Sequence, residues 1–74
     1  MPKSFSGRQV IKILCQGFGF GFVSQKGSHV KLRRRIGDRT ITTVVPLHKE
    51  LARGTLHGIL ELAEVNEKEF CEKT

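Results

Sequence analysis

His29 lies in the most basic stretch of the chain and is the best candidate for proton-transfer chemistry. An imidazole with an ordinary pKa of about 6.5 can accept or donate a proton close to neutral pH. Lys31 and Arg33 alternate with it, and Lys26 precedes it by three residues. Such cations can bind phosphates and stabilise negative charge developing on phosphorus. A lone histidine is more often an ordinary surface or capping residue than a catalyst, so the residue types alone leave both roles open for His29.

Five further residues are candidates for contact with a phosphate chain. Gly27 and Ser28 form a predicted turn in which the backbone can approach a phosphate and the serine can donate a hydrogen bond. We do not expect Ser28 to be a nucleophile, because no Ser-His-acid grouping is visible. Arg34 and Arg35 lie beside a predicted hairpin and are expected to hold backbone phosphates rather than bases. His48 is either a substrate-binding residue or a loop histidine.

Metal and cofactor chemistry has little support in the sequence. The two cysteines, Cys15 and Cys71, form no Cys-x-x-Cys pair, and the three histidines lack the spacing of zinc ligands. The glycine-rich segment 17–21 has no Gly-x-x-x-x-Gly-Lys pattern of a nucleotide-binding loop. We therefore expect no metal ion and no cofactor.

A strand over residues 29–34 would present the candidate residues together. Val30 and Leu32 alternate with His29 and Lys31, which predicts one apolar and one cationic face. A Gly-Asp pair at 37–38 predicts a hairpin, and the β-branched segment 40–45 predicts the next strand, ended by Pro46.

Helices are predicted on both sides of these strands. Ser6 can cap a helix that begins at Gly7 and ends at Gly17 or Gly19. A second helix is predicted to begin between residues 52 and 55, and Asn66 with Glu69 resembles the capping box of a last short helix. The apolar positions at helical spacing are Val10, Ile11, Ile13 and Leu14 in the first helix and Leu56, Ile59, Leu60 and Ala63 in the second.

Phenylalanine and glycine alternate between the first helix and the central strand. Phe18, Phe20 and Phe22 alternate with Gly19 and Gly21, which is strand periodicity. In so small a domain we expect all three rings in the core rather than stacked on bases. The glycines would then admit the first helix close to the sheet.

These elements predict an α+β fold with the order α-β-β-β-α. Both helices need apolar cover, so we expect them on one face of a three-stranded antiparallel sheet. Residues 1–74 would form one small domain with a core over about residues 6–70. The opposite sheet face would then present His29, Lys31 and Arg33 to solvent.

Charge is distributed unevenly along the 74 residues. The net charge is +6, but residues 1–53 carry 11 Lys/Arg and 2 Asp/Glu (+9), whereas residues 54–74 carry 2 and 5 (−3). This pattern favours a polyanionic partner, and charge alone leaves RNA, DNA, anionic lipid and acidic protein open.

No apolar run of about 18 residues exists, and residues 1–5 lack the apolar run of a signal peptide. We therefore expect a cytoplasmic protein with no membrane partner.

Several blocks of the sequence together resemble the HicA toxin family, bacterial mRNA interferases of toxin–antitoxin pairs. The opening SGRQVIK at residues 6–12 and the segment QKGSH at 25–29 are similar to the family's first two blocks. The segments VPLHKEL at 45–51 and RGTL at 53–56 are similar to later ones, and residues 67–70 to the closing one. The resemblance covers roughly residues 6–70 in the family's order.

This resemblance implies a fold akin to double-stranded-RNA-binding domains. It also implies that His29 is the catalytic residue of an endoribonuclease acting on mRNA, and that a HicB-type antitoxin silences it. The sequence departs from the family pattern in two places. Segments 17–22 and 42–45 each hold one residue more than usual, and either could form a bulge that changes the register of the sheet.

Two alternatives stay open at the level of sequence. The first is a non-catalytic double-stranded-RNA-binding module that uses the same basic sheet face, which would bind RNA without cleaving it. The second is a protein-interaction domain whose basic surface meets an acidic partner, which would have no affinity for RNA. Incubation with RNA separates all three.

Overall fold

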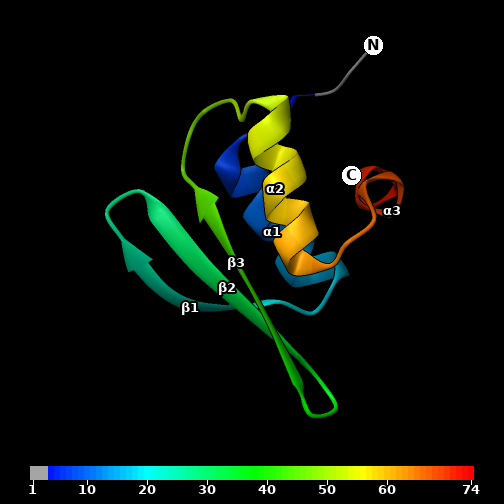
Figure 1. Cartoon of the computed structure of the whole chain (residues 1–74). Coiled ribbons are helices and arrows are strands. Elements are labelled where there is room, and N and C mark those ends of the chain that lie inside the picture. The colour runs from blue at the N-terminus through cyan, green and yellow to red at the C-terminus, as the bar shows by residue number, and fades with distance from the viewer. Residues whose placement is uncertain (1–3) are drawn as a thin grey trace.

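The predicted α+β architecture is confirmed by the computed structural model, which describes residues 4–74 (Figure 1). Part of the segment examined for a signal peptide, residues 1–3, lies outside the described residues. The elements in chain order are α1 (Gly7–Gly17), β1 (Gly21–Lys26), β2 (His29–Ile36), β3 (Arg39–Pro46), α2 (Arg53–Ala63) and α3 (Glu67–Glu72). The short α3 begins after Asn66, whose side chain accepts from the N–H groups of Lys68 and Glu69, which is the Asn66 half of the predicted capping box.

The three strands form one antiparallel sheet in the order β1-β2-β3. β2 and β3 pair without interruption from His29 opposite Pro46 to Ile36 opposite Arg39. The extra residue in segment 42–45 therefore forms no bulge. The irregularity in register lies instead in β1, between Phe22 and Ser24.

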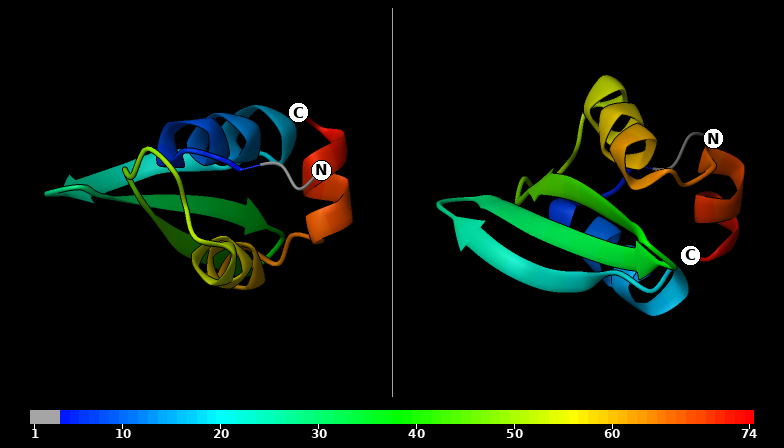
Figure 2. Two further views of the ribbon diagram at one scale, coloured as in Figure 1. Left: turned by 90° about the horizontal axis from the view of Figure 1, so that it is seen from above. Right: turned by 60° about the horizontal axis from the view of Figure 1, so that its bottom comes forward.

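One face of the sheet carries the apolar side chains and is here called the covered face. Residues directly opposite each other in an antiparallel pair share a face, and the pairs Val30–Val45 and Leu32–Thr43 are all buried. α1 and α2 lie on the same side of the sheet (Figures 1 and 2), as predicted. The core residues that they contribute are Val10 and Leu14 from α1, and Leu56, Ile59, Leu60 and Ala63 from α2.

The start of α1 is fixed tightly against the end of β3. Ser6 and Gln9 form a reciprocal capping box, which satisfies backbone N–H groups that a helix start leaves free. Gly7 is buried, and a Cβ built on it would lie 2.0 Å from the carbonyl oxygen of Pro46. The close approach of the first helix to the sheet was expected at Gly19 and Gly21. It occurs instead at Gly7, because the N-terminus of α1 is the part of the helix that contacts the end of β3.

The phenylalanine-rich segment differs from its prediction. β1 begins at Gly21, because the chain turns at Gly19 (φ +76°) and the Phe20 N–H still bonds to the Leu14 carbonyl oxygen of α1 at 3.1 Å. Phe20 is buried, and Phe18 packs against the core beside Phe70. Phe22 is 63% exposed as a residue, so the prediction of three core rings is wrong at this position.

The cysteines have different surroundings. Cys15 is half-buried in α1, and this burial raises the pKa of its thiol, whereas Cys71 is exposed on α3. Both are free thiols. Within residues 4–74, every helix is too short or too polar to cross a membrane.

Candidate functional site

The second face of the sheet, here called the open face, carries most of the predicted site residues. Lys26 pairs with His29 across the β1–β2 turn, so their side chains share this face. Lys31 and Arg33 follow on the same face at alternate positions of β2, and all four residues are exposed. The structure therefore brings together Lys26, His29, Lys31 and Arg33.

The turn beside His29 is open to an incoming ligand. Gly27 has φ +59°, which favours glycine, and a Cβ built on it would meet nothing within 4 Å. The Gln25 side-chain amide donates to the Gly27 carbonyl oxygen at 2.9 Å and steadies the turn. The turn projects beyond the helices (Figures 1 and 2). Gly27 and Ser28 thus lie next to His29 with room for a bulky partner.

The segment after β3 brings His48 toward the same end of the sheet. The Leu47 N–H donates to the Ser28 carbonyl oxygen at 2.6 Å, which extends the pairing with β2 past Pro46. The next residue, His48, is exposed, and its carbonyl oxygen accepts from the Gly7 N–H at 2.9 Å. The imidazole of His48 is thus on a chain segment anchored beside the turn that precedes His29.

Two neighbouring arginines lie on opposite faces of β2. Arg34 pairs with Ile41 on the covered face and is half-buried, and its Nε lies 3.8 Å from the position of a Cβ at Gly19. The structure therefore separates Arg34 from His29. Arg35 pairs with Thr40 and is exposed on the open face. The sequence predicted the same phosphate-binding role for Arg34 and Arg35, but the structure places only Arg35 on the open face with His29.

All the charged residues that the strands place on the open face are basic. None of the three strands contains Asp or Glu. Within residues 4–74 the ion pairs are Arg39 with Glu64, and His57 of α2 with Glu61 and Glu67 at 3.6 and 3.9 Å. The open-face cations have no such partner in this part of the chain, so their charge is available to an external anion.

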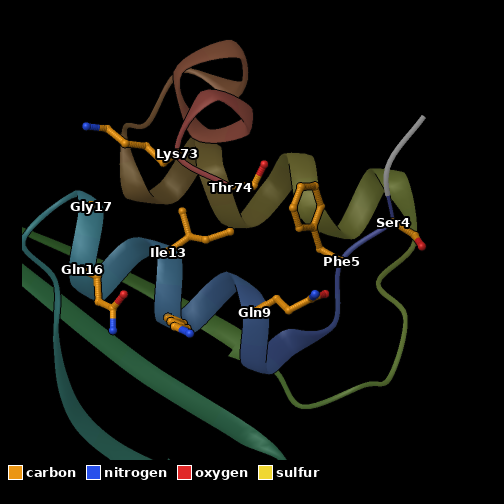
Figure 3. Close-up of a pocket in the computed structure, with 9 residues that line it drawn as sticks. Ser4, Phe5, Gln9, Ile13, Gln16, Gly17, Lys73 and Thr74 are labelled. Carbon is orange, nitrogen blue, oxygen red and sulfur yellow. The ribbon is translucent and has the colours of Figure 1, made fainter. Parts of the chain in front are cut away.

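Within residues 4–74, the surroundings of the site offer no metal-binding cluster. In the described part of the chain no group of three or more His, Cys, Asp or Glu could hold a metal ion. A hollow of about 710 Å³ lies between α1 and the C-terminal residues (Figure 3). Its lining includes Gln9, Lys12, Ile13 and Lys73 but no residue of the sheet and no acid–base pair. The hollow is therefore separate from the open face.

The arrangement on the open face suits proton transfer at a phosphodiester. The imidazole of His29 is accessible, and Lys26 and Lys31 lie beside it on adjacent positions of the sheet. An exposed imidazole can move one proton near neutral pH. The ammonium groups can bind the phosphate and stabilise the extra charge of a five-coordinate phosphorus.

Comparison with known proteins identifies a related family. The family model described as HicA toxin of bacterial toxin-antitoxin matches residues 7–65, which include all three strands and both longer helices. No curated protein matches the sequence.

Proposed function

The chain belongs to the HicA toxin family of bacterial toxin–antitoxin systems, and on this premise we propose that it is an endoribonuclease that cleaves mRNA, with His29 as general acid or base. The observation that supports this most directly is the position of His29, exposed on a basic sheet face that none of the helices within residues 4–74 covers. Lys26 and Lys31 supply the phosphate contacts closest to it. His48 contacts the substrate from the anchored segment after β3.

The proposed reaction uses the RNA's own nucleophile. The ribose 2′-oxygen forms a bond to the adjacent phosphorus, while the bond from phosphorus to the 5′-oxygen of the next nucleotide breaks. One proton leaves the 2′-hydroxyl and one reaches the departing 5′-oxygen. His29 carries out one of these two transfers. The products are a 2′,3′-cyclic phosphate and a 5′-hydroxyl, and no metal ion is needed to generate the nucleophile.

The test compares two exposed histidines that lie on different elements. We expect His29→Ala to lower the rate of RNA cleavage by roughly 10²- to 10⁴-fold, which is the usual contribution of positioned acid–base transfer. His57→Ala, on α2, should cleave at the wild-type rate. Cleavage should persist in EDTA and should leave 2′,3′-cyclic phosphate ends. A folded, fully active His29→Ala variant, or plain 3′-hydroxyl ends, would contradict the mechanism.

Binding without cleavage would favour the non-catalytic alternative. If the wild-type protein binds RNA but leaves it intact under all these conditions, the chain is a double-stranded-RNA-binding module that uses the same face. Growth arrest on expression of the wild type, and its loss in His29→Ala, would support cleavage in cells.

Membership of a toxin–antitoxin family implies an antitoxin partner. We propose that a HicB-type antitoxin neutralises the toxin by covering the open face with acidic groups, since opposite potentials favour association. A charge reversal at Lys31, Lys31→Glu, should then weaken antitoxin binding more strongly at low salt than at high salt. Unchanged affinity would place the antitoxin elsewhere on the toxin.

A further inference from the structure

The open-face cations of β2 form a single row that begins at His29. Lys31, Arg33 and Arg35 follow it at every second residue, and all are exposed. With about 3.3 Å per residue along a strand, the row from His29 to Arg35 extends roughly 20 Å. We propose that this row, named here the β2 cation row, binds one RNA strand along β2, with the cleaved bond at His29 and Arg35 as the farthest contact.

Lys26 lies opposite His29 at the start of the row, but the neighbours of Lys31, Arg33 and Arg35 are short and uncharged. On the β1 side, Gly21 pairs with Arg33 and Ser24 with Lys31. On the β3 side the open-face residues opposite the row are Val44, Thr42 and Thr40. The long cationic side chains therefore stand above the strands on both sides. A row that is one side chain wide matches one sugar–phosphate backbone.

The row extends in one direction only. His29 is the first residue of β2, and the chain before it is the Gly27–Ser28 turn. Every β2 cation of the open face therefore lies on the same side of His29. The RNA strand is held over several nucleotides on one side of the cleaved bond and only by the turn region on the other. This inference rests on the proposed function for the position of the cleaved bond, but not for the RNA contacts themselves.

Three consecutive arginines provide the matched test. Arg33→Gln, Arg34→Gln and Arg35→Gln each remove one charge from adjacent positions, but only the first and third change the open face. Made in a His29→Ala background, they can be compared by fluorescence anisotropy with a labelled single-stranded RNA at several salt concentrations. Circular dichroism checks that each variant is folded.

We expect Arg33→Gln and Arg35→Gln to weaken RNA binding by roughly tenfold, the effect of one charge-assisted hydrogen bond. Each should also reduce the slope of log affinity against log salt by about 0.7, the value for one phosphate contact with a single strand. Arg34→Gln should change affinity and slope much less, and Arg35→Lys should retain most of the affinity. Equal effects of Arg34→Gln and Arg35→Gln would overturn the proposal, as would full affinity in Arg35→Gln.

The one-sided contact has its own readout in the wild-type enzyme. RNA substrates shortened from one side of the cleaved bond should lose cleavage rate sooner than substrates shortened from the other side. Equal losses of cleavage rate on shortening from either side would contradict the claim that the RNA is held mainly on one side of the cleaved bond. If Arg33→Gln and Arg35→Gln weaken RNA binding more than Arg34→Gln but the wild type does not cleave RNA, the β2 cation row is supported and the nuclease function is rejected. If the wild type cleaves RNA but the three variants bind it equally well, the nuclease function is supported and the β2 cation row is rejected.

Discussion

The covered face and the open face of the sheet use alternate residues of the same strands, yet their side chains differ in almost every property. On the covered face Val30 and Leu32 are 3% and 0% exposed and pack beneath the helices. On the open face the intervening His29, Lys31 and Arg33 are exposed and have no ion-pair partner within residues 4–74. Stability and the proposed chemistry are thus encoded by two interleaved sets of residues, which substitutions can separate.

The largest contrast is expected between two adjacent residues of β2. Leu32→Ala should lower the free energy of unfolding by about 2–5 kcal/mol, because it leaves a cavity under the helices. Arg33→Ala should change it by less than about 0.5 kcal/mol, while weakening RNA binding. Urea denaturation and RNA affinity, measured on both variants, check this pair. Similar losses of stability in the two would contradict the separation of faces.

A glycine on the covered side provides the next test. Gly7→Ala should destabilise the protein by about 1–3 kcal/mol, because its Cβ would meet the backbone oxygen of Pro46, which cannot move freely.

The matched control is Gly58→Ala in α2, where a Cβ would meet nothing within 4 Å. It should stabilise the protein by about 0.5–1 kcal/mol, as alanine does in a helix interior. Thermal denaturation measures the melting temperature of both variants. If both substitutions shift it in the same direction, the backbone contact at Pro46 does not explain the need for glycine at position 7.

The polar residue of the covered face should have a smaller effect. Thr43 is 1% exposed, and its hydroxyl donates to the Ile59 carbonyl oxygen of α2 at 2.8 Å. Thr43→Val keeps the shape and removes this hydrogen bond, so we expect a loss of about 1 kcal/mol. Chemical denaturation provides the measurement, and a loss above about 3 kcal/mol would indicate a repacked core instead.

The smallest effect is expected for an exposed ion pair. Arg39 of β3 bonds to Glu64 at the end of α2, and both side chains are largely solvent-accessible. Arg39→Gln should cost less than about 1 kcal/mol, and the difference should shrink in high salt. Denaturation at two salt concentrations tests this. A salt-independent cost would mean that packing, rather than charge, stabilises the contact.

Local periodicity was enough to predict much of the fold and part of the site. The alternation around Val30 and Leu32 correctly divided β2 into two faces, and with it placed His29 and Lys31 outward. The Gly37–Asp38 turn and the buried stripe of α2 were also predicted correctly. These features depend on residues that are close in sequence, so the periodicity of a single segment is enough to predict them.

What the sequence missed depends on contacts between distant segments. The alternation of Phe18 and Phe20 with glycine has strand periodicity, but a hydrogen bond to Leu14 keeps this segment at the end of α1. The need for glycine at Gly7 arises from Pro46, 39 positions later. The position of His48 likewise depends on its bond to α1, which no spacing in the sequence indicates.

The segment between β3 and α2 lacks regular structure but is held by three backbone hydrogen bonds. The N–H groups of Leu47 and Leu51 donate to Ser28 and Phe5, and that of Gly7 donates to His48. These amides should therefore exchange with solvent deuterium as slowly as those of a strand, and the segment should open only when the start of α1 leaves the sheet. His48 would then be held in place by the same cooperative unit that holds the first helix.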